Sequence, residues 1–145
     1  MAKIRLGAEE IKYITLFEAM TGAKVRDCVA LEDAMGFLIH PGQMGKAIGK
    51  KGASVERVQK TLGKKIWLSE YHEDKMYFIR NLFQPVRLRR IQLKEGKHHP
   101  TVIIEVSPKD RKKILGHNGQ RIKIAKKLIQ RHNIAEDIMV KSSRR

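Results

Sequence analysis

Two short segments bounded by glycines contain the residues whose types and spacing could do chemistry. They are Gly49-Lys50-Lys51-Gly52 and, 67 residues later, Gly116-His117-Asn118-Gly119. Glycine has no Cβ, so such a turn can adopt positive φ and lets another backbone come close. Each turn also precedes a predicted helix, whose first N–H groups and dipole favour a phosphate. The two segments therefore predict binding of a polyanionic backbone.

Basic and polar side chains lie in these turns and directly beside them. The candidate binding residues, with the glycines that shape the turns, are Lys46, Gly49, Lys50, Lys51, Gly52, Lys112, Lys113, Gly116, His117, Asn118, Gly119 and Arg121. The lysines and Arg121 can neutralise phosphate charge, while His117 and Asn118 can donate or accept hydrogen bonds.

The overall charge supports a polyanionic partner. The chain has 145 residues, with 31 Lys and Arg against 15 Asp and Glu, and a net charge of +16. Such an excess favours nucleic acid first and an anionic membrane surface second. Residues 73–145 hold 19 of the basic residues, and residues 1–72 hold 12. A hydrophobic fraction of 41% is enough for packed cores.

The rest of the composition narrows the class of protein. The single cysteine, Cys28, excludes an internal disulfide and fits a reducing cytosol, so we expect a cytoplasmic protein. No apolar run approaches the ~18 residues of a membrane span, and no signal peptide is visible. We also expect no metal site and no cofactor, because His98 and His99 lack companion ligands at metal spacing.

Hydrophobic periodicity predicts the same series of elements twice. In the first half we expect helices at 8–21, 43–48 and 54–62, and strands at 26–31, 37–39 and 65–69. In the second half we expect helices at 73–83, 107–115 and 120–131, and strands at 86–89, 101–106 and 138–140. The alternation that starts at Val86 changes phase before Ile91, which predicts a β-bulge there.

The halves are an internal repeat with an offset of 67 residues. Pro41 matches Pro108, both glycines of each turn coincide, and the apolar phase of the following helix agrees. Each half predicts an α+β domain, a three-stranded sheet with helices on one face, with boundaries at 1–72 and 73–145. Residues 71–74 contain no flexible linker sequence, so we expect the two domains to be rigidly joined. We also expect the protein to be a monomer.

An aliphatic residue and Gly-x-x-Gly between two helices resembles the KH nucleic-acid-binding domain. A helix and strand before the motif resembles its type II form, and two copies in tandem resemble the archaeal NusA-like transcription factors. The resemblance implies a non-enzymatic protein that holds unpaired nascent RNA in two Gly-x-x-Gly grooves and modulates transcription elongation or termination. It also implies RNA polymerase as a partner.

Other functions remain open at this stage. Type II KH domains also occur in ribosomal proteins, so a ribosome-associated or ribosome-assembly role is the main alternative. Arg87, Arg89 and Arg90 are either a second RNA surface or charges that protect a strand edge. A nucleotide-hydrolysing P-loop is disfavoured, because only three residues separate Gly45 from Gly49 and Lys51 replaces the hydroxyl that would bind magnesium.

Overall fold

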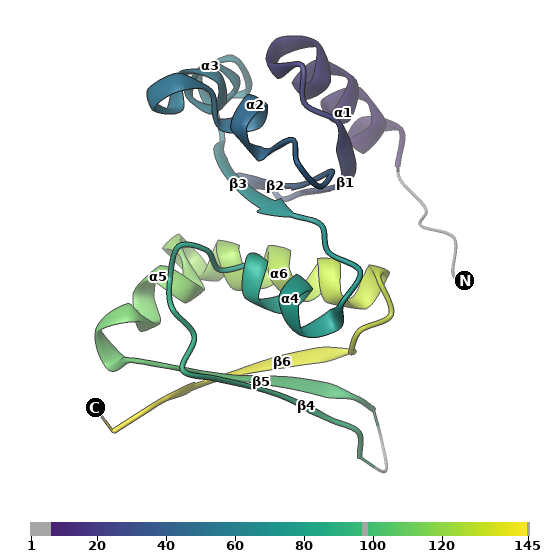
Figure 1. The fold of residues 1–145 in the computed structure, drawn as a ribbon. Coiled ribbons are helices and arrows are strands. Elements are labelled where there is room, and N and C mark those ends of the chain that lie inside the picture. The colour runs from purple at the N-terminus through teal and green to yellow at the C-terminus, as the bar shows by residue number, and fades with distance from the viewer. Residues whose placement is uncertain (1–6, 97–98, 145) are drawn as a thin grey trace. The chain divides into compact units, whose positions relative to one another are not determined.

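The computed structural model describes residues 7–96 and 99–144 (Figure 1). The described chain forms two compact units, and the division falls between Glu73 and Asp74. Each unit contains one three-stranded sheet and several helices, so the predicted α+β class is confirmed.

The first unit begins with a long helix and ends with the third strand of its sheet. Its elements are α1 (Ala8–Thr21), β1 (Val25–Ala30), β2 (Ala34–Ile39), α2 (Met44–Ile48), a 3₁₀ turn (Lys50–Gly52), α3 (Ala53–Leu62) and β3 (Lys65–Glu70). β2 is the central strand, antiparallel to β1 and parallel to β3. The three helices cover one face of this sheet (Figure 1).

The core of the first unit lies between these helices and the sheet. Phe17 of α1 stacks on Phe37 of β2 with ring centroids 4.3 Å apart, an arrangement that adds to the stabilisation from area burial. Val58 of α3 and Cys28 of β1 are fully buried in the same cluster. The buried Cys28 therefore packs as a small hydrophobic group. This packing fixes the positions of α2 and α3, which flank the first glycine turn.

The second unit repeats this order. Its elements are α4 (Lys75–Asn81), β4 (Arg90–Lys94), β5 (Thr101–Val106), a 3₁₀ turn (Pro108–Asp110), α5 (Arg111–Leu115), a 3₁₀ turn (His117–Gly119), α6 (Gln120–Arg131) and β6 (Asp137–Ser142). The central strand β5 is antiparallel to β4 and parallel to β6, and the helices again cover one face (Figure 1).

Local signals explain where the second unit's helices begin. The carboxylate of Asp74 accepts hydrogen bonds from the backbone N–H groups of Met76 and Tyr77 and so caps α4. Pro108 opens the next helical segment at a position where its missing N–H costs nothing. Ile114, Leu128 and other apolar side chains of α5 and α6 are buried.

Two predictions about irregular strands were wrong. Residues 86–89 form no strand, because Val86 donates to Phe83 in a turn and β4 starts only at Arg90. No bulge precedes Ile91, since the register of β4 against β5 is continuous. The register shift lies in β1 instead, between Val25 and Asp27. Residues 96–100, where a glycine and a proline predict a turn, lie partly outside the described residues.

Candidate nucleic-acid interface

The two glycine turns have nearly the same backbone conformation. Gly49 has φ 77° and ψ 170°, and Gly116 has φ 75° and ψ 173°. Only glycine adopts this region of φ and ψ readily, because a Cβ would clash with the backbone. The N–H of the closing glycine donates to the carbonyl of the opening glycine at 3.1 Å in both copies. The sequence repeat is therefore also a repeat of turn geometry.

The opening glycine of each turn also touches the helix that follows. A Cβ placed on Gly49 would lie 2.7 Å from both the Cβ and the backbone N of Ser54. A Cβ placed on Gly116 would lie 2.8 Å from the Cβ of Arg121. Real Cβ atoms do not approach neighbours this closely. Each opening glycine is therefore required for both conformation and space.

The residue before each closing glycine is left-handed although it is not glycine. Lys51 has φ 55° and Asn118 has φ 54°. Gly52 and Gly119 follow with φ 78° and 70° and cap α3 and α6 without a capping side chain. Glycine offers no side-chain acceptor, and the first N–H of each helix donates to the turn itself, from Ala53 to the Lys50 carbonyl and from Gln120 to the His117 carbonyl. The positive end of each helix dipole therefore lies at the turn without a capping side chain. This geometry suits a phosphate oxygen.

The first turn presents positive charge to solvent. Lys46 on α2, and Lys50 and Lys51 in the turn, are all exposed, and none of the three forms an ion pair within the described residues. Ile48, the last residue of α2, is 40% exposed despite its apolar side chain. Cations beside an exposed aliphatic surface are what a phosphate backbone with adjoining bases would require.

The second turn is less positive. His117 and Asn118 are exposed at the positions that Lys50 and Lys51 hold in the first turn. Lys112 is exposed on α5, whereas the ammonium of Lys113 lies 3.7 Å from the carboxylate of Asp110. The second turn therefore has an imidazole and an amide where the first has two lysines, and it has fewer uncompensated cations.

Arg121 is not available to a phosphate, and this part of the sequence prediction was wrong. Its residue surface is only 6% exposed. The guanidinium donates to the carbonyl oxygens of Gln84 at 2.8 Å and Lys113 at 3.0 Å. Burial lowers the pKa of Arg121 to about 10, so it stays charged at neutral pH. Its role is to connect the segment after α4 with α5 and α6.

The described part of the chain contains neither a group of metal ligands nor a membrane-spanning helix. Within residues 7–96 and 99–144, no three His, Cys, Asp or Glu side chains are grouped as metal ligands. Nor does any helix in these ranges combine the length and apolar character that crossing a bilayer requires. His98, one of the two adjacent histidines of the sequence, lies outside the described residues.

Comparison with known proteins gives a consistent result. Residues 10–97 match the KH domain family. This range starts within α1, covers the rest of the first unit and continues through β4. The "Probable transcription termination protein NusA" of Methanocaldococcus jannaschii is 35% identical over 97% of this chain and 76% of its own length. The protein of the same name from Halococcus morrhuae is 30% identical over 94% of this chain and 97% of its own.

A solved structure has the same fold over almost the full length. The structure titled "Crystal structure of APE1850" superimposes with a TM-score of 0.77 at 29% sequence identity. The match covers 94% of this chain and all of that one. Both units therefore have counterparts in a solved protein of similar sequence.

Proposed function

The chain belongs to the KH-domain family and to the archaeal NusA-like proteins within it, and from this premise we propose that it binds single-stranded RNA and acts on transcription termination. KH domains hold about four nucleotides through the backbone of the Gly-x-x-Gly turn, with unpaired bases in an adjacent groove. The observation that carries this proposal is the first turn, where exposed lysines lie at the N-terminus of α3, which has no side-chain cap.

Both units are proposed to act as type II KH domains, divided as 1–72 and 73–145. The nearly equal backbone angles at Gly49 and Gly116 support this, since the turns present their amides in the same way. The proposed RNA-binding residues are Lys46, Gly49, Lys50, Lys51 and Gly52 in the first domain, and Lys112, Lys113, Gly116, His117, Asn118 and Gly119 in the second. A strand held by both would bind more tightly than by either alone.

The biological role follows from the kinship with proteins named for transcription termination. We place the protein on nascent transcripts, as a non-catalytic cytoplasmic monomer that contacts RNA polymerase and modulates elongation or termination. A KH protein of the ribosome or of ribosome assembly is the competing role. Co-purification separates the two: recovery with RNA polymerase supports the transcription role, whereas recovery with ribosomal subunits alone would replace it.

The salt dependence of RNA binding tests the first turn directly. We expect replacement of Lys50 and Lys51 by Gln to flatten the slope of log K against log salt by about 0.7 for each phosphate that is no longer neutralised. The RNA is an unstructured single strand, and affinity is measured by fluorescence anisotropy. Replacing both lysines by Asp should weaken binding further, because the charge is reversed.

A matched control keeps the same change in net charge. Lys12 of α1 and Lys60 of α3 are exposed lysines of the same unit outside the turn. Their joint replacement by Gln should leave the slope close to that of the unmodified protein. Equal salt slopes for both double variants would show that the lysines of the turn do not contact phosphates. Tighter binding of duplex than of single-stranded RNA would contradict a groove that holds unpaired bases.

A further inference from the structure

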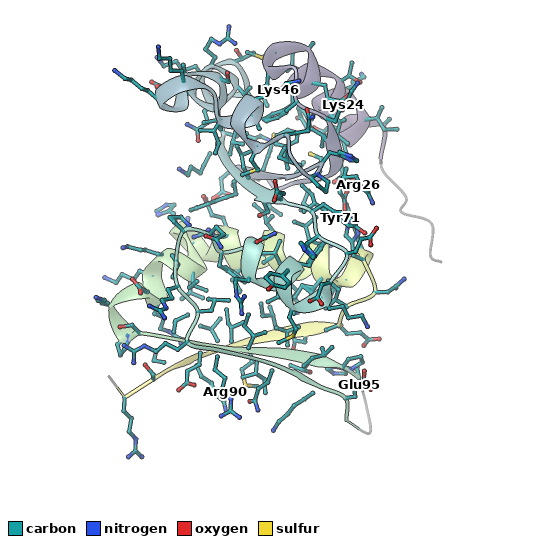
Figure 2. All side chains as sticks on the ribbon, viewed as in Figure 1. Lys24, Arg26, Lys46, Tyr71, Arg90 and Glu95 are labelled. Atoms are coloured by element: carbon teal, nitrogen blue, oxygen red, sulfur yellow. The ribbon has the colours of Figure 1, made fainter. Side chains whose placement is uncertain are left out.

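Arg26 lies at the irregular position of β1 and covers an aromatic ring. Val25 pairs with Ile39 and Asp27 pairs with Leu38, so Arg26 is the extra residue of a β-bulge. Bulges redirect a side chain and are frequent beside functional sites. Here the guanidinium carbon lies 4.0 Å from the ring centroid of Tyr71, which follows β3. Both residues are labelled in Figure 2.

Short backbone contacts connect this pair to the first glycine turn. The N–H of Tyr71 donates to Ile39 at the end of β2, the residue that pairs with Val25. The next residue of the chain, His40, donates to the carbonyl of Lys24 at 2.9 Å. The side-chain oxygen of Gln43 accepts from the N–H of Lys24, and Gln43 directly precedes α2, which runs to the turn. These hydrogen bonds therefore connect the strand ends beside the pair with the residue before α2, and the glycine turn follows the end of α2.

The surface between them is mainly basic. Lys24, Arg26 and Lys46 are exposed, and all three are labelled in Figure 2. Two carboxylates also lie here, and both accept backbone hydrogen bonds: Glu18 from Val25 at 2.9 Å and Glu70 from Gly42 at 3.2 Å. These bonds direct the carboxylate oxygens toward the protein backbone. The exposed cations then determine what an approaching anion meets.

We infer that Arg26 and Tyr71 form a stacking platform for an RNA base beyond the four nucleotides held at the first turn. This inference rests on the proposed RNA-binding function. An exposed guanidinium plane that is backed by an aromatic ring offers a flat surface on which an unpaired base can stack. Lys24 and Lys46 would meet the phosphates between the platform and the turn. The platform accepts any base, because every base has a π-face.

The test compares RNA lengths and uses a variant that keeps the charge. In Arg26→Lys with Tyr71→Leu, the positive charge remains but the planar guanidinium and the ring are removed. We expect this variant to bind an unstructured RNA of roughly eight nucleotides about 5-fold to 150-fold more weakly, the range for loss of one stacked base. Its affinity for an RNA of about four nucleotides should be unchanged.

Tyr77 and Arg80 provide the matched control, because they form a second Arg–Tyr pair with a centroid distance of 5.3 Å on α4. Arg80→Lys with Tyr77→Leu should leave both affinities unchanged. Tyr71→Phe should bind like the unmodified protein. Abasic nucleotides beyond the fourth should weaken RNA binding by the unmodified protein, and this comparison involves no variant whose fold could differ. If the longer RNA keeps its full advantage in the Arg26 and Tyr71 variant, the platform is wrong. If the unmodified protein binds neither RNA, the proposed function itself fails.

Discussion

At the residue scale, Lys51 and Asn118 occupy the same left-handed backbone position with different side chains. Asn tolerates this conformation because its short side chain can bond locally, whereas for lysine it costs roughly 1 kcal/mol or more. The first turn therefore combines a cation with backbone strain at this position, whereas the second turn has a residue that tolerates the conformation and has less charge.

The two glycines of one turn should respond differently to alanine. Gly49→Ala should lower the free energy of unfolding by roughly 3 kcal/mol or more, because the Cβ meets Ser54 and the backbone enters a region reserved for glycine. Gly52→Ala should cost about 1 kcal/mol, since its Cβ meets nothing within 4 Å and only φ is unfavourable.

Denaturant unfolding followed by far-UV circular dichroism measures both glycine variants under the same conditions. The unmodified protein is the reference, and Gly42→Ala is a control for a positive φ outside the turn, with no neighbour within 4 Å of the added Cβ. If Gly49→Ala and Gly52→Ala lowered the free energy of unfolding equally, the contact of the added Cβ with Ser54 would contribute nothing to the cost at Gly49.

At the scale of secondary-structure elements, Arg121 connects three parts of the second unit. Arg121→Met should lower the free energy of unfolding by about 2 kcal/mol, because carbonyls of Gln84 and Lys113 lose a charged donor. RNA affinity should not change at temperatures where the variant is folded. Thermal unfolding and RNA binding are measured on the same preparation.

Arg111 is the control for this variant. Its guanidinium also donates to a backbone carbonyl, that of Val140 at 3.1 Å, but the residue is exposed. Water can replace this bond, so Arg111→Met should change stability by less than about 0.5 kcal/mol. If Arg121→Met lost RNA affinity without losing stability, Arg121 would have to be counted among the RNA-binding residues.

Three elements have the bounds that the sequence predicted, and a glycine or a proline directly precedes each of them. The helix at Ala8–Thr21, the strand at Thr101–Val106 and the helix at Gln120–Arg131 have the predicted bounds. The strand at 86–89 failed because alternation of Val86 and Leu88 is satisfied equally by a turn that follows α4. Period two indicates which side chains face inward, but a strand also needs a partner, and pairing is not visible in a local pattern.

The candidate site was predictable in its turns and less so around them. Glycine spacing identifies both turns, because only glycine suits the opening position. The error at Arg121 arose because a basic residue beside a turn has the same sequence signature whether it faces solvent or a row of carbonyls. The bulge that carries Arg26 had no signal either, since the extra residue is defined by the register of β1 against β2.

At the scale of the whole molecule, the connection between the units is very short. The N–H of Tyr71 is bonded to Ile39 of the first unit, and Asp74 caps α4 of the second. Only His72 and Glu73 separate these two anchored residues. Rigid joining of the two domains stays a prediction from the sequence, and it can be tested.

Insertion of a flexible linker tests the prediction that the two domains are rigidly joined. Placing a Gly-Ser linker of about ten residues between His72 and Glu73 should lower affinity for an RNA long enough to reach both turns, because the effective concentration of the second site falls. Affinity for an RNA of about four nucleotides should stay the same. ¹⁵N relaxation should give one rotational correlation time for the unmodified protein; two independent values would contradict rigid joining.

The position of each turn within its sheet has a consequence for how the protein is made. Parallel neighbours such as β2 and β3 cannot be joined by a hairpin and need a long crossover. In both units that crossover is the helix, glycine turn and helix that form the candidate site. The candidate binding turn therefore lies within the crossover that each parallel strand pair requires, so neither sheet can be completed unless the chain passes through that turn.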